Sequence, residues 1–261
     1  MGQFTKYVNI EIVWDLISVM REYFKIELLE TSTHQSREEG ISNILAGLLC
    51  AFQIMEVGAG TIFNVDEKDF TTALYQVCQR MYEQPRNLKS EIKDFTALLK
   101  CLDLVFLQKK QLSSELINAF VKRLAMLQMH LPPAYQAAVL YLIKQIMNKY
   151  SSARSAMLEL EDDTIGGGFQ ITPRIAMYKA DIGDPQLAQA GQTNIIFELL
   201  HTIDFWQKYL KVQLSQGDNR RPELKVAHIC LKLAKSILSS DSIPQDLLTE
   251  NPVKLLQTYA S

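Results

Sequence analysis

The chain has 261 residues, a formal net charge of −2 and 48% hydrophobic residues, which is typical of a folded protein large enough to bury a substantial core. No apolar run approaches the ~18 residues of a membrane span, and no charged segment followed by an apolar core predicts a signal peptide. The four cysteines lie in helical patterns without a CxxC pair, which predicts free buried thiols in a reducing compartment rather than disulfides or a zinc site.

Apolar residues recur at three- and four-residue steps in the first part of the chain, the period of helices with one buried face. A polar stretch at 30–40 is predicted to be a connector. Gly58 and Gly60 are expected to end one helix, and Asp66 to cap the next. The predicted helices span residues 9–29, 41–57, 66–81 and 92–106.

The stretch 112–150 contains two apolar helical patterns separated only by Pro132 and Pro133. Pro132 disfavours helical backbone at Leu131, and Pro133 suits the first turn of the next helix. Because the joint is so short, the two helices are predicted to pack antiparallel through their apolar stripes. This hairpin is expected to be the repeating unit of the fold.

The stretch 159–193 is rich in glycine and proline and carries no sustained helical period. A loop of this length is more often functional than decorative, and Asp184-Pro185 could open one short helical turn within it. Further helices are predicted at 195–210, 224–238 and 253–259, the last one capped by Asn251 and Pro252. No strand pair is predicted. The expected fold is therefore all-α, a single domain over 1–261 built as an α-solenoid of stacked antiparallel helical hairpins, like HEAT or armadillo repeats.

Charge is distributed unevenly along the chain. Residues 104–154 hold seven bases and one acid, whereas 155–207 hold eight acids and two bases. On a helical wheel Lys122, Lys144 and Lys149 point away from the apolar stripes, while Arg123 lies nearer a stripe and could satisfy an interhelical partner. A basic edge attracts phosphate. The candidate RNA-binding residues are Lys109, Lys110, Lys122, Lys144, Lys149 and Arg154.

An alternative is that these lysines are simply solvated, or that they form the surface on which the acidic loop lies. Changing Lys122, Lys144 and Lys149 together to Glu is predicted to leave folding intact and to abolish RNA retention. The loop itself is expected to pack across the helices, or to dock on a partner protein, because its apolar side chains are costly to leave in water. Those side chains are Phe169, Ile171, Ile175, Met177 and Tyr178.

No combination of residues supports catalysis. The three glycines at 166–168 lack the Lys-Ser/Thr of a phosphate loop. Glu198 and His201 have a metal-binding spacing but no second copy of it, and Asp162-Asp163 lacks the third aspartate of a magnesium-pyrophosphate motif. The sequence thus predicts no enzyme, no metal or other cofactor and no small-molecule substrate.

Several segments share the order and character of segments in one known family. They are NIEIVWDLISVM at 9–20, the stretch 49–75, ELINAFVKRLAMLQMHLPP at 115–133, YKADIGDPQLAQAGQTNIIFELL at 178–200, VAHICLKLAKSIL at 226–238 and KLLQTYA at 254–260. Together they resemble the C-terminal part of the CCAAT-binding-factor domain family of nucleolar complex-associated proteins. The sequence departs from that family at Phe197, where tryptophan is usual, in the long helical pattern at 202–214 and in a polar insert at 215–221. The given sequence does not contain the N-terminal half usual in the family, so the chain is expected to be either a very compact relative or a fragment.

The resemblance implies a non-catalytic assembly factor of the large ribosomal subunit, located in the nucleus and nucleolus. Such a factor would pair with a second solenoid, a homologue of nucleolar complex protein 2, and would chaperone pre-ribosomal RNA and ribosomal proteins, with no membrane partner. The alternative is a protein-binding helical-repeat adaptor, for transport or scaffolding, without RNA contact. Salt-sensitive retention on total RNA would separate the two.

Overall fold

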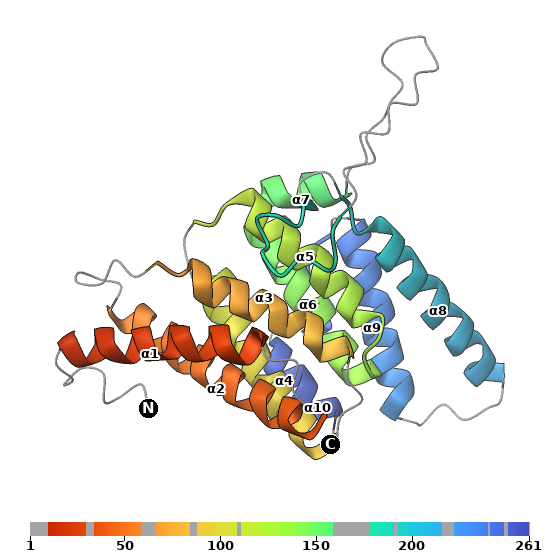
Figure 1. Cartoon of the computed structure of the whole chain (residues 1–261). Coiled ribbons are helices and arrows are strands. Elements are labelled where there is room, and N and C mark those ends of the chain that lie inside the picture. The colour runs from red at the N-terminus through yellow and green to blue at the C-terminus, as the bar shows by residue number, and fades with distance from the viewer. Residues whose placement is uncertain are drawn as a thin grey trace, which may run out of the picture. The chain divides into compact units, whose positions relative to one another are not determined.

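Helices make up most of the described part of the chain in the computed structural model (Figure 1). The structure describes residues 10–29, 34–58, 66–83, 88–108, 111–158, 178–190, 193–215, 222–239, 241–247 and 250–260. No strand occurs within these ranges, so the all-α prediction is confirmed for them. The chain divides into two units, 1–110 and 111–261, which are described separately.

The first unit is built around α2 (His34–Gly58), which packs against α1 (Ile10–Leu29), α3 (Lys68–Glu83) and α4 (Leu88–Leu102). Its core holds large side chains such as Ile17, Phe24, Leu48, Phe70 and Leu98. A Cβ on Gly47 would lie 2.9 Å from the Phe24 ring, so only glycine allows α1 and α2 to approach this closely. Helix α4 continues into a π-helical segment, Asp103–Gln108, whose wider turns the sequence pattern did not predict.

Local sequence signals set several helix ends in this unit. The Asp66 carboxylate accepts a hydrogen bond from the backbone N–H of Lys68, the first residue of α3, at 3.0 Å, so it satisfies one of the free amides at the helix start, although it lies one residue before the cap position. Helix α2 ends at Gly58, as predicted, but it begins at His34. The prediction of a connector at 30–40 was therefore wrong for 34–40. Arg and Glu are good helix formers, and a helix can begin before its apolar pattern does.

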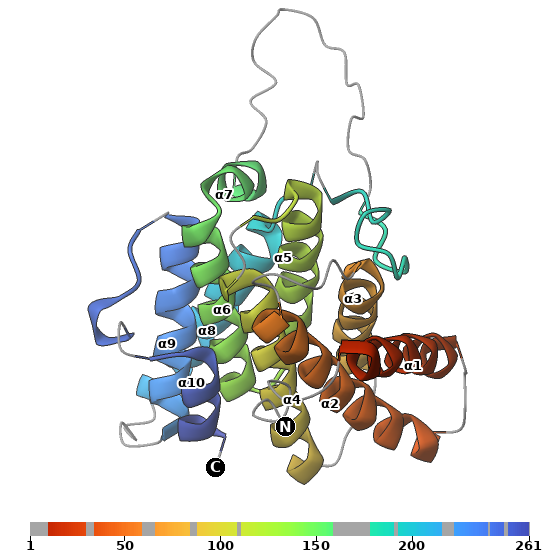
Figure 2. The ribbon, with the colours of Figure 1, turned by 90° about the vertical axis from the view of Figure 1, so that its left-hand side faces the viewer.

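The second unit is built around the predicted hairpin of α5 (Ser114–Gln128) and α6 (Pro133–Lys149), joined at Pro132 with Pro133 in the first turn of α6. Helix α6 also contacts α7 (Ser151–Leu158), α9 (Pro222–Leu238) and α10 (Pro252–Tyr259), and Figure 2 shows it surrounded by these neighbours. Every residue from 134 to 144 is buried. A helix that is enclosed on all sides in this way forms the centre of its unit.

The remaining helix, α8 (Ile196–Ser215), packs on α9 and touches α5. After α9 the chain passes through a short 3₁₀ turn, Gln245–Leu247, to α10. The predicted cap of α10 is confirmed, because Asn251 Oδ1 accepts a hydrogen bond from the Lys254 N–H at 2.7 Å. Since α10 returns to α6, the second unit is not a simple stack in which each hairpin touches only the next. The solenoid arrangement is not confirmed and stays a prediction.

All four cysteines are free, and three of them (Cys78, Cys101 and Cys230) are buried, in agreement with the prediction of free thiols. Burial raises the pKa of the Cys101 and Cys230 thiols, which keeps them protonated and unreactive. None of the described helices is both long and apolar enough to cross a bilayer.

Candidate functional site

Arg123 on α5 holds the described segment of the long loop against the hairpin. Its side chain is 2% exposed, and its guanidinium donates hydrogen bonds to the carbonyl oxygens of Ala180 at 2.6 Å and Ile182 at 3.0 Å and to the Tyr178 hydroxyl at 3.2 Å. The fork of donors on an arginine suits several acceptors at once. The prediction that Arg123 satisfies an internal partner is confirmed, and the described loop segment 178–190 packs on α5 through it.

The neighbouring Lys122 fixes the chain just after the loop, where α8 begins. Its ammonium pairs with the buried carboxylate of Glu198 at 2.5 Å and donates to the Asn194 carbonyl oxygen at 2.8 Å. Lys122 thereby ties the first turn of α8 to α5. The prediction that Lys122 points outward into solvent was wrong, because the helical wheel of α5 alone could not show that α8 covers this side.

Lys144 was also predicted to point outward, and the structure corrects this as well. The residue is 1% exposed, and its ammonium donates to the carbonyl oxygens of Ser236, at 2.6 Å, and of Asp241. Carbonyls in the last turn of a helix such as α9 lack intrahelical donors, so a lysine can satisfy them. Burial, and next the charge of Arg154, lower the pKa of Lys144, while Asp241 opposes the shift.

The other predicted site residues are divided between surface positions and undescribed ones. Lys149 is exposed, with its ammonium 5.3 Å from the centre of the Tyr150 ring, and Arg154 is half-buried. Lys109 and Lys110 lie outside the described residues, as do the loop side chains Phe169, Ile171, Ile175 and Met177. Tyr178 is half-buried and holds its hydroxyl against Arg123. RNA binding at the basic residues and partner docking by the loop both stay predictions.

A chain of buried polar side chains joins α5, α6 and α8 beside the hairpin joint. Gln136 donates to Gln128 Oε1 at 2.6 Å, Gln128 donates to the Thr202 hydroxyl at 2.9 Å, and the Trp206 indole N–H donates to Gln136 Oε1 at 2.9 Å. Sequence reasoning missed this network. Its signal was a glutamine on the apolar stripe of each hairpin helix, because a buried polar group needs a hydrogen-bond partner.

The network forms the floor of a pocket of about 200 Å³ between the hairpin joint and α8. Apolar residues and one histidine make up the rest of its wall. The lining residues are Met129, Leu131, Pro133, Gln136, His201, Thr202, Phe205 and Trp206.

The outer face of α8 continues from the rim of this pocket. Four large apolar side chains on this face are exposed: Phe197, Leu200, Phe205 and Val212. They fall within about 140° of the helix surface at 100° per residue, opposite the buried Leu199, Trp206 and Leu210. We call these four residues the α8 face. An apolar surface beside a concave pocket is typical of protein-binding sites.

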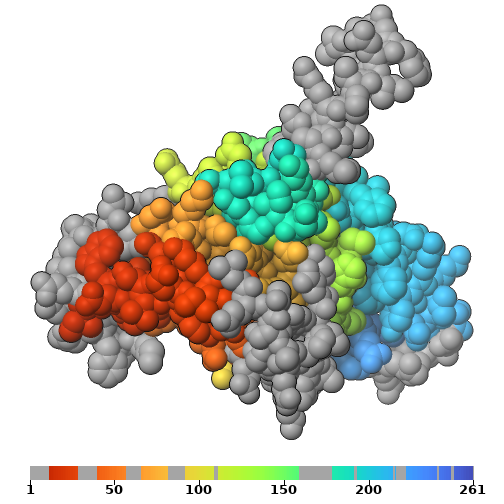
Figure 3. All heavy atoms as spheres, in the orientation of Figure 1, coloured from red at the N-terminus to blue at the C-terminus, as the bar shows by residue number. Residues whose placement is uncertain are grey.

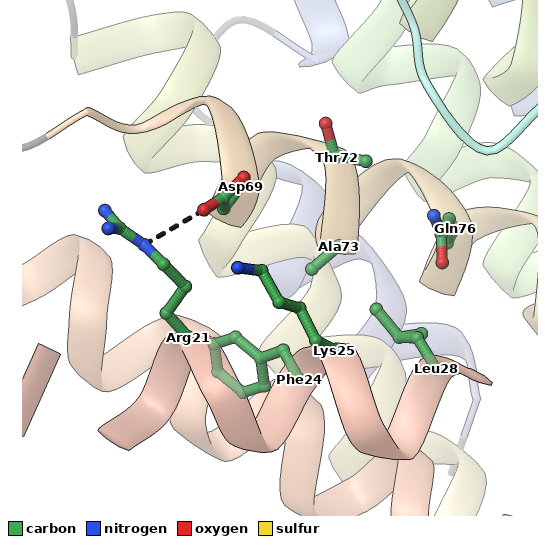
Figure 4. Close-up of a pocket in the computed structure, with 8 residues that line it drawn as sticks. All are labelled: Arg21, Phe24, Lys25, Leu28, Asp69, Thr72, Ala73 and Gln76. Carbon is green, nitrogen blue, oxygen red and sulfur yellow. Dashed lines mark ion pairs between the residues drawn. The ribbon is translucent and has the colours of Figure 1, made fainter. Parts of the chain in front are cut away.

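A second pocket of about 200 Å³ lies in the first unit, between α1 and α3 (Figure 4). Arg21 closes one end of it, with its Nε 3.0 Å from Asp69 Oδ2 and its guanidinium over the Phe70 ring. Lys25 and Gln76 also line it. Within the described ranges, no three His, Cys, Asp or Glu side chains come together in a way that could hold a metal ion. Glu198, considered above for its metal-binding spacing, is instead paired with Lys122.

Comparison with known proteins gives a consistent result. A model of the CBF/Mak21 family matches residues 44–203, which run from α2 into α8 and include the hairpin and the loop. The chain is 27% identical over 219 residues to nucleolar complex-associated protein 3 of Schizosaccharomyces pombe, which covers 76% of this chain and 28% of the relative. It is 26% identical over 204 residues to the nucleolar complex protein 3 homolog of Xenopus laevis, covering 78% of this chain and 22% of the relative. Against the human homolog it is 25% identical over 197 residues, covering 74% of this chain and 21% of the relative. The chain therefore spans well under a third of the length of these relatives.

Proposed function

The chain belongs to the CBF/Mak21 family, and we propose that it is a non-catalytic assembly factor of the large ribosomal subunit that works in the nucleolus. The observation that carries this proposal is the family match over 44–203, together with relatives whose names place them in a nucleolar complex. The matched span contains the Arg123 and Lys122 contacts that hold the loop on the hairpin. These contacts stiffen a surface and supply no catalytic group.

Its partner in this proposal is a second helical protein, a homologue of nucleolar complex protein 2, which binds the α8 face and the pocket beside it. Two exposed aromatic rings, Phe197 and Phe205, supply the large rigid side chains that dominate binding energy in protein interfaces. The Gln128–Gln136 network supports this proposal, because it fixes the floor of the pocket from below.

This partner contact is tested by co-purification of the partner homologue with the full chain from cells. We expect the double change Phe197→Glu and Phe205→Glu to abolish co-purification, and Ala46→Glu, at an exposed site on α2 in the first unit, to leave it unchanged. Fluorescence imaging of the tagged chain tests the location. Equal recovery of the partner with both variants, or exclusion of the folded chain from nucleoli, contradicts the proposal.

Contact with pre-ribosomal RNA is a further part of the proposal, with the exposed Lys149 and the half-buried Arg154 as the predicted RNA-binding residues that are not enclosed in the second unit. Lys109 and Lys110 remain candidates. The second possible function, a protein-binding adaptor without RNA contact, is favoured by one specific observation. Lys122, Arg123 and Lys144 are all engaged inside the protein, so the hairpin offers less basic surface than its sequence predicts.

Retention of purified chain on total RNA at increasing salt separates these two functions. If RNA is bound, each neutralised phosphate adds about −0.7 to −0.9 to the slope of log affinity against log salt. The double change Lys149→Glu and Arg154→Glu should then weaken retention and flatten the slope. The same change at two exposed lysines of α9, Lys225→Glu and Lys235→Glu, is the control. Retention without salt dependence favours the adaptor, whereas salt-dependent retention with equal effects of both pairs would show that Lys149 and Arg154 are not the specific RNA contact.

A further inference from the structure

Helix α1 has two apolar faces, and only one of them is buried in the protein. Val13, Ile17 and Phe24 lie in the core of the first unit. Large apolar side chains also follow one another along another side of the helix, with exposed fractions from 37% to 67%. These exposed residues, which we call the α1 stripe, are Ile12, Leu16, Val19, Tyr23 and Ile26.

The α1 stripe has the spacing of a coiled-coil seam. Its residues follow one another at steps of four, three, four and three, the a/d pattern of a heptad repeat. At 100° per residue all five lie within about 40° of Ile12, so they form one continuous line along the helix. Single exposed apolar residues are normal, but a contiguous line of them marks an interaction surface. Figure 3 shows α1 at the surface of the molecule.

The border of the α1 stripe is acidic. Asp15 and Glu22 occupy the g positions of the heptads, and both are exposed. Glu27, at an e position on the other border, is half-buried. The cations Arg21 and Lys25 line the pocket towards α3, as Figure 4 shows, and the Lys25 ammonium also forms an exposed ion pair with Glu22 Oε1 at 3.4 Å. A helix lying on the stripe would therefore meet negative charge along its edges.

This charge pattern selects the kind of partner. In an antiparallel pair of two copies the g positions face each other, which would bring Asp15 and Glu22 of one copy towards the same acids of the other. In a parallel pair Glu22 would face Glu27 of the second copy. Like charges opposed across an interface suppress wrong partners, so a second copy is disfavoured in both orientations. The same acids repel the phosphates of RNA and of anionic lipid surfaces.

We propose that the α1 stripe binds an amphipathic helix of a partner protein that carries an apolar heptad stripe bordered by Lys and Arg. Apolar side chains of the partner would complete a two-helix seam with the five stripe residues, and its basic side chains would pair with Asp15 and Glu22. Helix α1 lies outside the residues that the family model matches, and the proposal does not depend on the function proposed above.

The test uses the full chain and a synthetic helical peptide of about three heptads, with Leu at a and d and Lys at e and g. Binding of the labelled peptide is followed by fluorescence anisotropy. A second peptide with Glu in place of every Lys differs only in the sign of its border. We expect the Lys peptide to bind at least about tenfold more tightly than the Glu peptide.

Single and double variants of the chain show where the Lys peptide binds. Val19→Glu, and separately Ile26→Glu, should weaken binding of the Lys peptide by at least about tenfold, as loss of an interface anchor does. Ala156→Glu is the control, since it places the same charge at an exposed apolar residue of α7 that belongs to neither the α1 stripe nor the α8 face. The double change Asp15→Lys and Glu22→Lys should reverse the preference between the two peptides. Circular dichroism checks that each variant keeps its helices.

Four outcomes overturn the proposal. The Lys peptide does not bind, Ala156→Glu weakens binding as much as Val19→Glu does, or the two peptides bind equally well. The fourth is that Val19→Glu abolishes a different property of the chain, either dimerisation in sedimentation experiments or retention on RNA or anionic vesicles. The last result would assign the stripe to a second copy, to nucleic acid or to a membrane.

Discussion

Helices α1 and α6 both carry apolar residues beyond a single stripe, yet their surroundings differ. Helix α6 contacts α5, α7, α9 and α10 and is enclosed, so that even Lys144 is internal. Among the described helices, α1 makes its main contacts with α2 and α3, and the α1 stripe stays exposed. The number of neighbouring helices thus decides whether an apolar residue joins the core and whether a lysine reaches the surface. The periodicity of one helix contains no information about that number.

The most severe change should come from placing a charge on the buried side of α1. Ile17 is 1% exposed and Val19 is 67% exposed, although only one residue separates them. Ile17→Asp buries a carboxylate without a partner and should cost about 4 kcal/mol or more of unfolding free energy. Val19→Asp should change it by no more than ~0.5 kcal/mol. Urea denaturation measures both, and similar losses in the two variants would mean that α1 is covered on both faces.

The next largest effect concerns the two lysines of α6 that looked equivalent in the sequence. Lys144→Glu would place a buried acid against two carbonyl oxygens and should cost about 3 kcal/mol. Lys149→Glu, on the exposed end of the same helix, should cost no more than ~0.5 kcal/mol. We therefore no longer expect the triple change of Lys122, Lys144 and Lys149 to Glu to leave folding intact. Equal urea midpoints for the two single variants would show that Lys144 is not internal.

A smaller loss is expected when the loop is released from α5. Arg123→Ala removes the donors that satisfy the carbonyls of Ala180 and Ile182 and should cost about 2 kcal/mol. Because the lost bonds belong to the loop, limited proteolysis should show faster cleavage near them than in the wild type. Arg154→Ala, at a half-buried arginine, is the control for loss of a cation. If Arg123→Ala leaves both stability and cleavage unchanged, the loop is held by other contacts.

The helices and their ends were predictable because their causes are local in sequence. The apolar period placed the hairpin, and Asp66, Pro133 and Asn251 marked helix starts through bonds to residues two or three positions away, or through a fixed backbone angle. The assignment of Arg123 to an internal partner also succeeded, since its wheel position lay near the apolar stripe.

The candidate site was less predictable because its contacts are distant in sequence. Lys144 bonds to carbonyls 92 and 97 residues away, and Lys122 pairs with an acid 76 residues away. No helical wheel contains these partners. The α1 stripe was missed although its heptad pattern is local and visible in the sequence. An apolar pattern alone does not reveal which apolar residues the rest of the protein leaves exposed.

The smallest effect is expected for a cation at the surface, where the contrast with Lys144 is greatest. Lys232 on α9 pairs with Asp246 at 2.7 Å, and both side chains are more than half exposed. The hydrogen bond from Lys232 lowers the pKa of Asp246 below its ordinary 3.8; burial opposes this shift, and the charge of the lysine adds to it. Because the folded-state pKa is the lower one, this pair adds stability above about pH 4, and that contribution is lost as the pH falls through the folded-state pKa.

Solvent screening limits this contribution to ~0.5 kcal/mol or less, so Asp246→Asn should barely shift the urea midpoint at pH 7. Lys232→Met should return the pKa of Asp246, followed by the NMR shift of its carboxyl carbon, to the ordinary value. An unchanged titration in that variant would show that the ion pair is not populated in solution.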